Sequence, residues 1–167
     1  MTQRFLCTLI FLITVVTAQA QTAIGKRTVD GNSAILDFAT GTTNGIILPA
    51  VTTLPASPAN GTFLLDKNDR RVKMRQNGTW VNLSDAGSTS AIVANPTSET
   101  ANKTVMGSRS SNADGVLVLE ASDKALILPK INSPHLNVKS PYPGMMCYDT
   151  ASQSMAIFDG FVWSYWK

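Results

Sequence analysis

One pattern runs through the sequence twice. The segment 22–27 (TAIGKR) recurs 82 positions later as 104–109 (TVMGSR). Further pairs keep an offset between 80 and 83: Leu36-Asp37 with Leu119-Glu120, Ile46-Ile47-Leu48-Pro49 with Leu126-Ile127-Leu128-Pro129, and 58–66 with 141–149. Self-similarity at a fixed period indicates two copies of one structural unit. We therefore divide the chain into repeat one (residues 21–83), a linker rich in Ser, Thr, Asn and Ala (84–103) and repeat two (104–167).

Both repeats have the pattern of short β-strands. Apolar-rich runs of strand length come first in each repeat, and a predicted meander of three strands ends it: 62–67, 71–76 and 79–83, then 145–149, 154–158 and 161–166. Asn77-Gly78 is a strong two-residue hairpin signal, and Asp159-Gly160 is predicted to form the corresponding turn. We expect an all-β protein of two homologous small lobes with about five short strands each. Because so small a lobe is marginal alone, the lobes pack on each other as a pseudo-symmetric pair, or each packs on a neighbouring chain.

The first twenty residues predict export. Arg4, the apolar run 5–16 and Ala18-Gln19-Ala20 follow the order of a signal peptide cleaved after Ala20, and the run is too short for a permanent anchor. Cleavage would also remove Cys7, leaving one thiol, and would reduce the 14 Lys and Arg residues to 13 against 11 Asp and Glu. We expect no disulfide, no later membrane span and, given the weak positive charge, no nucleic-acid partner.

The sequence offers little for catalysis. His135 lies in a Pro-flanked loop, where a solvated side chain is expected, and Cys147 alternates with apolar neighbours in a predicted strand without an evident base. The segment 66–69 (DKND) lacks the remaining ligands of a calcium loop and is interpreted as a hairpin turn. Neither metal-ligand spacing nor a phosphate-binding glycine run occurs. We expect no enzyme, no cofactor and no metal site.

Two surface features are more informative. Arg71, Lys73 and Arg75 alternate along one predicted strand, beside Arg70 in the adjoining turn, and would present their charges on one face. They are interpreted as the charges that protect an edge strand, or as a docking patch for an acidic partner or an anionic glycolipid.

The second feature is aromatic. In the last predicted strand Phe161, Trp163 and Tyr165 point to one side, and Val162, Ser164 and Trp166 to the other. Core packing, a protein interface and a platform for sugar rings all remain open interpretations of this row.

The order of motifs resembles a repeat of exported Bacteroidota surface proteins. Repeat one carries SAxLD at 33–37, GxxLP at 45–49, PxxGxxxxD at 58–66 and NGxW at 77–80, and repeat two is most similar at 144–149 and 159–163. The resemblance covers nearly all of the chain after residue 20. It implies a structural or binding role in the cell envelope, without chemistry. The Arg that usually follows the Leu-Pro pair is replaced by Ala50 and Lys130, which puts any role of that Arg in doubt for repeat one. Asp149-Thr150-Ala151 resembles the short O-glycosylation motif of Bacteroidota, which predicts a glycan on Thr150.

These observations predict a non-catalytic exported protein. We expect an accessory subunit or adaptor of an adhesin, gliding or type IX secretion assembly, located at the outer membrane or cell surface, or alternatively in the periplasm. Its envelope protein partner would contact Arg70, Arg71, Lys73, Arg75, Trp163, Tyr165 and Trp166. The alternatives are a carbohydrate-binding module that uses Trp163, Tyr165 and Trp166, and a self-assembling, homo-oligomeric fibre segment.

Overall fold

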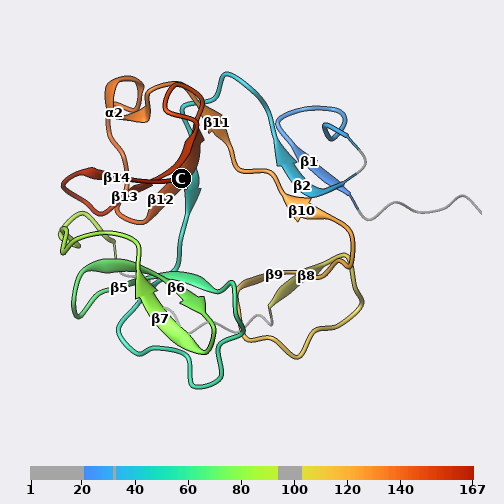
Figure 1. Ribbon diagram of the computed structural model, residues 1–167, viewed down its shortest axis with the longest axis horizontal. Helices are drawn as coiled ribbons and strands as arrows, with labels where there is room; N and C mark the ends of the chain where they lie inside the picture. Colours follow the sequence, from blue (N-terminus) through green and yellow to red (C-terminus); the bar gives the residue numbers. More distant parts are fainter. Residues whose placement is uncertain (1–20, 32, 94–102) are drawn as a thin grey trace, which may run out of the picture.

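The computed structural model describes residues 21–31, 33–93 and 103–167 (Figure 1). The predicted signal peptide and residues 94–102 of the predicted linker lie outside the described residues. Within the described part the chain forms fourteen short strands and one single-turn helix, α2 (Pro134–Asn137), so the predicted all-β class is confirmed. Seven strands fall in each repeat rather than five, because residues 22–24 and 50–51, and their equivalents in repeat two, form additional short strands.

The strands of repeat one are β1 (Thr22–Ile24), β2 (Ala34–Phe38), β3 (Ile46–Ile47), β4 (Ala50–Val51), β5 (Phe63–Asp66), β6 (Arg71–Gln76) and β7 (Thr79–Asn82). Those of repeat two are β8 (Thr104–Met106), β9 (Leu117–Leu119), β10 (Ala125–Leu126), β11 (Lys130–Ile131), β12 (Met145–Asp149), β13 (Ser154–Phe158) and β14 (Trp163–Trp166). The predicted bounds hold without change for β6, β12 and β13, which have their partners nearby in the sequence.

The order of strand pairings is the same in both repeats. The first two strands pair in parallel, β1 with β2 and β8 with β9. A second parallel pair, β4 with β5 and β11 with β12, then leads into an antiparallel three-stranded meander. The register differs from the sequence match at one place: Leu117, and not Leu119, lies where repeat one has Leu36.

The two predicted hairpin turns have different structures. Asn77 and Gly78 have φ angles of 48° and 74°, the left-handed values of a type I′ turn, so the predicted two-residue connection between β6 and β7 is confirmed. The turn predicted at Asp159-Gly160 is wrong in length. Phe158 pairs with Trp163, which leaves four residues between β13 and β14.

Strands of one repeat also pair with strands of the other repeat (Figure 1). β10 of repeat two pairs in parallel with β2 of repeat one, and Ile127 N–H donates to the Leu36 carbonyl at 2.9 Å. β3 of repeat one pairs antiparallel with β12 of repeat two, and Leu48 N–H donates to the Gly144 carbonyl at 3.0 Å. The repeats therefore share sheets instead of forming two separate lobes.

The larger core cluster also draws on both repeats. Its buried members are Leu48, Leu65, Val72, Leu83, Met146 and Ile157. A second cluster lies within the sheet of repeat two and consists of Ile131, Met145, Cys147 and Ala156, with Phe158 and Trp163 packed against it. Because burial of apolar surface is the main favourable term in folding, the shared cluster is what holds the two meanders together.

Residues 84–93 of the predicted linker are also attached to both repeats. Gly87 N–H donates to the Arg70 carbonyl at 2.8 Å, and Ser88 N–H donates to the Asp159 carbonyl at 2.9 Å. Further on, Val93 N–H donates to the Tyr142 hydroxyl at 2.9 Å. This stretch therefore lies in contact with the turns of both meanders.

Candidate functional site

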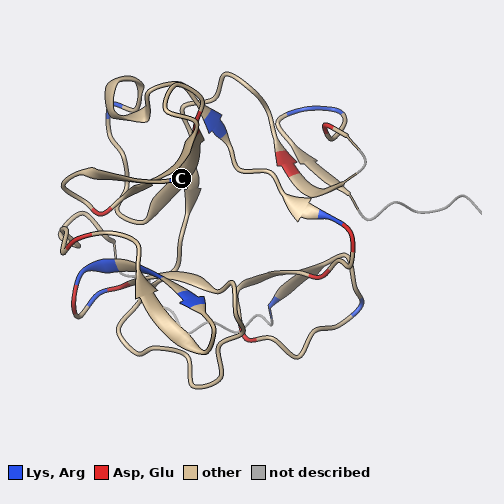
Figure 2. Cartoon of the chain, viewed as in Figure 1, with Lys and Arg blue, Asp and Glu red and all other residues tan. Residues whose placement is uncertain are grey.

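The last strand of the chain presents a row of exposed apolar side chains. Among the described strands, β14 forms the edge of the sheet β11-β12-β13-β14. The exposed fractions are 67% for Phe161, 57% for Val162, 41% for Tyr165 and 40% for Trp166. Residues 154–166 contain one charged residue, Asp159, so the charges in Figure 2 lie mainly elsewhere. We name Phe161, Val162, Tyr165 and Trp166 the aromatic edge.

A buried carboxylate holds the loop that carries the first two of these residues. Asp159 is 1% exposed, and its Oδ1 accepts hydrogen bonds from Phe161 N–H at 2.8 Å and from Val162 N–H at 2.9 Å. A side-chain oxygen that accepts from the backbone in this way stabilises a turn locally. The two apolar side chains are thus presented to solvent by a loop of defined conformation.

The helix α2 extends the aromatic edge. His135 Nδ1 lies 3.0 Å from the Tyr165 hydroxyl, and the two rings meet edge to face with centroids 6.3 Å apart. The next residue, Leu136, is 71% exposed. The pKa of Tyr165 is raised, mainly because its hydroxyl group is partly buried and to a smaller extent because of the negative charge of Asp149. The Tyr165 hydroxyl group therefore stays protonated. His135 is exposed, as expected of a solvated side chain, but it lies in α2 and not in a loop, and its contact with Tyr165 adds it to this surface.

The predicted aromatic residues do not form one platform. Trp163 packs against the second core cluster and lies 5.4 Å from the Phe158 ring, centroid to centroid. Trp166 lies on the opposite face of β14, and its indole N–H donates to the Leu83 carbonyl of repeat one at 2.6 Å. A flat sugar-binding surface of Trp163, Tyr165 and Trp166 is therefore not supported by the geometry.

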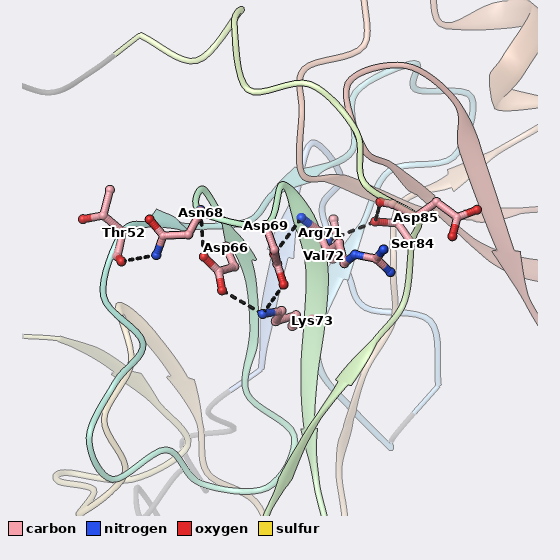
Figure 3. A network of polar contacts seen from close by, with 9 residues as sticks. All are labelled: Thr52, Asp66, Asn68, Asp69, Arg71, Val72, Lys73, Ser84 and Asp85. Atoms are coloured by element: carbon pink, nitrogen blue, oxygen red, sulfur yellow. Dashed lines mark hydrogen bonds and ion pairs between the residues drawn. The ribbon is translucent and has the colours of Figure 1, made fainter.

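The basic strand presents fewer charges than its sequence suggested (Figure 3). Lys73 is 9% exposed, and its Nζ lies 2.7 Å from Asp66 Oδ2 and 2.6 Å from Asp69 Oδ2. Its charge is thus neutralised inside the protein, which corrects the expectation that Lys73 faces a partner. The Lys73 ammonium thus lies between Asp66 and Asp69, the two carboxylates of the segment 66–69 that was compared with a calcium loop.

The pKa shifts of this group follow from its contacts. Burial alone would raise the pKa of Asp66, but the hydrogen bonds from Lys73 and from Asn68 N–H lower it below its ordinary value. Burial alone would lower the pKa of Lys73, but Asp66 and Asp69 raise it. Both groups are therefore charged over the ordinary pH range, as an ion pair at the β5–β6 turn.

The remaining cations of the basic strand lie nearer the surface. Arg70 is exposed, and Arg71 and Arg75 are half-buried. The Arg75 guanidinium lies 5.7 Å from the centre of the Trp80 ring, within the range of a cation–π contact. Arg70, Arg71 and Arg75 are the members of the predicted basic patch that are accessible to a partner.

The thiol and the predicted glycan acceptor have opposite environments. Cys147 is fully buried, and burial, with a smaller effect of Asp149, raises its pKa to about 12, so it is an unreactive thiol.

Thr150 is exposed in the turn after β12. Its neighbour Asp149 is buried and accepts hydrogen bonds from Ser133 N–H, Ala151 N–H and the Ser152 hydroxyl. The glycan on Thr150 remains a prediction.

Within the described residues, neither a metal-binding cluster nor a membrane-spanning helix is found. No group of three or more His, Cys, Asp or Glu side chains is placed there to hold a metal ion. α2 has four residues, and no helix in the described ranges is long and apolar enough to cross a membrane.

Sequence reasoning counted Phe161 in the aromatic row and placed Val162 on the other face of the strand, but it missed that both lie in one exposed loop, and it missed His135 and Leu136 as members of the surface. The signal that could have found Phe161 and Val162 is Asp159, whose carboxylate is suited to hold a longer turn.

Comparison with known proteins finds no matching family model, curated protein or solved structure.

Proposed function

We propose that this protein is a non-catalytic exported subunit or adaptor of a cell-surface or outer-membrane assembly, and that it binds a protein partner through the aromatic edge. The observation that carries the proposal is the series of exposed, uncharged side chains along an edge strand and its loop, with Tyr165 and Trp166 on opposite faces of that strand. Large apolar side chains in contiguous exposed positions are typical of interaction sites. Aromatic residues are enriched among those that dominate binding energy.

Three features of the edge support a protein partner over a sugar. The exposed side chains include aliphatic Val162, and Leu136 lies next to the His135–Tyr165 contact. The edge strand offers unpaired backbone groups to an added strand. Trp163 is turned into the core cluster, which leaves Tyr165 as the exposed ring of that face. Arg70, Arg71 and Arg75 would contribute attraction to an acidic partner.

A paired substitution tests this proposal. Phe161→Ser with Val162→Ser removes two exposed apolar side chains but keeps Asp159 and its turn. We expect the ratio of co-purified envelope partner to this protein to fall at least about tenfold, the effect of losing roughly 1.4 kcal/mol of binding free energy. The matched control is Ile24→Ser, which removes a 46% exposed side chain from β1.

The control should leave the partner ratio unchanged. Equal recovery of the partner with the paired variant and with wild type would contradict docking through the aromatic edge. Circular dichroism and thermal unfolding of each variant would show that the fold is retained, because both substitutions are at exposed positions.

A further inference from the structure

A half-buried lysine and a buried aspartate meet beside the first two strands. Lys26 follows β1 by two residues, Asp37 lies on β2, and the two strands run in parallel. The Lys26 ammonium contacts Asp37 Oδ2, and the exposed fractions of the two side chains are 17% and 1%. The contact thus joins two neighbouring strands of the β1-β2-β10 sheet near their ends.

The Asp37 carboxyl group is held on both oxygens by backbone donors. Asp30 N–H donates to Oδ2 at 2.7 Å, and Phe38 N–H donates to Oδ1 at 2.8 Å. A second carboxylate is adjacent, since Asp30 Oδ2 lies 3.0 Å from Lys26 Nζ. Lys130 Nζ lies 3.8 Å from the same Asp30 oxygen. An amine, a carboxyl group, two N–H donors and a proton acceptor are therefore in one place.

We propose that Lys26 and Asp37 condense to an intramolecular isopeptide bond with the loss of one water molecule, and that Asp30 relays a proton in this step. The bond would lock β1 to β2 covalently, a modification distinct from the docking function proposed above.

The step balances without an added reactant. A proton passes from the Lys26 ammonium to the Asp37 carboxylate, which gives a neutral amine and a carboxylic acid. The Lys26 nitrogen then attacks the carboxyl carbon, and the Phe38 N–H stabilises Oδ1, the oxygen that gains negative charge, while the Asp30 N–H holds Oδ2, which carries the transferred proton as the hydroxyl group. The Asp30 carboxylate takes the second proton from nitrogen and passes it to the hydroxyl group. The C–O bond breaks, one water molecule leaves, and the amide keeps the third proton.

Burial and contact both favour this reaction over the same one in water. The ion pair is the resting state, because the contact lowers the pKa of Asp37 and raises that of Lys26 although burial alone acts in the opposite direction. The neutral pair that reacts is its minor form, and the burial of the Asp37 carboxyl group, which is 1% exposed, makes that form more accessible than it is in water. Holding the reacting groups together gives effective concentrations of about 10⁵ M or more in favourable cases.

Repeat two does not have the two reacting groups of this site. The position equivalent to Lys26 is Ser108, and in the strand register Val118 lies where repeat one has Asp37. At the second ion pair, Lys73 with Asp66, the Asn68 N–H donates to Asp66 Oδ1 and the other oxygen faces the ammonium, whereas Asp37 accepts a backbone N–H on each of its two oxygens. We therefore expect one bond and the loss of one water.

Mass spectrometry of the chain, expressed in full and purified in its processed form, tests the proposal. After denaturation the mass should be lower by one water than the sequence of the processed chain requires. Trypsin should fail to cleave after Lys26 and should release a branched peptide that joins the residues ending at Arg27 to peptide 28–67. Lys26→Met should abolish the loss, and Lys73→Met should retain it.

Two more variants separate the bond from an ordinary ion pair. Asp37→Asn should lose ammonia in place of water, because the amide nitrogen is then the leaving group. Asp30→Asn should slow bond formation strongly. An intact mass without the loss, with Lys26 and Asp37 found in separate linear peptides after prolonged incubation at neutral pH, would overturn the proposal and leave a buried ion pair only.

Discussion

At the scale of single residues, the buried carboxylates explain how this chain holds its turns. Asp37, Asp66, Asp149 and Asp159 are each at most 5% exposed, and each accepts at least one backbone N–H hydrogen bond. The turns after Asp66, Asp149 and Asp159 could be predicted from the sequence, because Asn, Thr or Gly follows within two residues. Asp37 lies within β2 and carries no such signal. The positions of the other three carboxylates at turns were therefore predictable. The burial of the carboxylates was not predictable, because it depends on segments that are distant in the sequence.

The Lys73 ion pair should contribute substantially to stability. Lys73→Met would leave the Asp66 carboxylate buried without its cation, and removal of one partner of a buried pair is costly. We expect a loss of about 3 kcal/mol in the free energy of unfolding at pH 7, measured by urea denaturation. Adding Asp66→Asn should restore most of the loss, since Asn removes the charge and can still accept from Asn68 N–H. A double variant as unstable as Lys73→Met would contradict this account.

The difference in the free energy of unfolding between wild type and Lys73→Met should depend on pH. The pKa of Asp66 is lowered from its ordinary value of 3.8, so the ion pair stabilises the fold above that value and loses its effect as the pH falls through the folded-state pKa. The pKa of Lys73 is raised from 10.5, so the effect is complete below pH 10.5 and is lost as the pH rises through the folded-state pKa. The gap between wild type and Lys73→Met should therefore narrow below about pH 3.8.

At the scale of elements, local signals were reliable where both partners of a contact are close in sequence. The β6–β7 hairpin was predictable because Asn77-Gly78 has one favoured turn geometry. The two-residue strands β3 and β10 were predicted as longer runs within their own repeats. Their partners, β12 and β2, lie in the other repeat, and no local pattern indicates such a pairing.

The contact between 84–93 and the β13–β14 turn should be sensitive to one methyl group. A Cβ on Gly87 would lie 2.0 Å from the Asp159 carbonyl oxygen, so Gly87→Ala forces the backbones apart. We expect a loss of about 1–3 kcal/mol in the free energy of unfolding. Gly115→Ala is the control, because its Cβ would meet nothing closer than 3.4 Å. Equal stability of the two variants would show that the segment does not depend on this contact.

At the scale of the whole molecule, the repeat predicted related strand orders but not their interleaving. The motifs of each copy recur, and the order of pairings recurs with them. The sheets nevertheless combine strands of both copies, and the larger core is shared. The site was predictable in part: the final strand was selected for its aromatic residues, but Trp163 is turned inward and Lys73 is neutralised. Which side of a strand is buried is decided by the neighbouring sheet, and a strand's own alternation leaves both choices open.

The central claim is that the aromatic edge contacts a protein partner in the cell envelope, and site-specific photo-crosslinking in living cells tests it most directly. A photoreactive phenylalanine analogue at Phe161 should yield one adduct of constant mass with an envelope protein. The same analogue at Ile24 on β1, away from the edge in Figure 1, should yield none. A folded protein that forms no adduct at Phe161, or the same adducts at both positions, would contradict the claim.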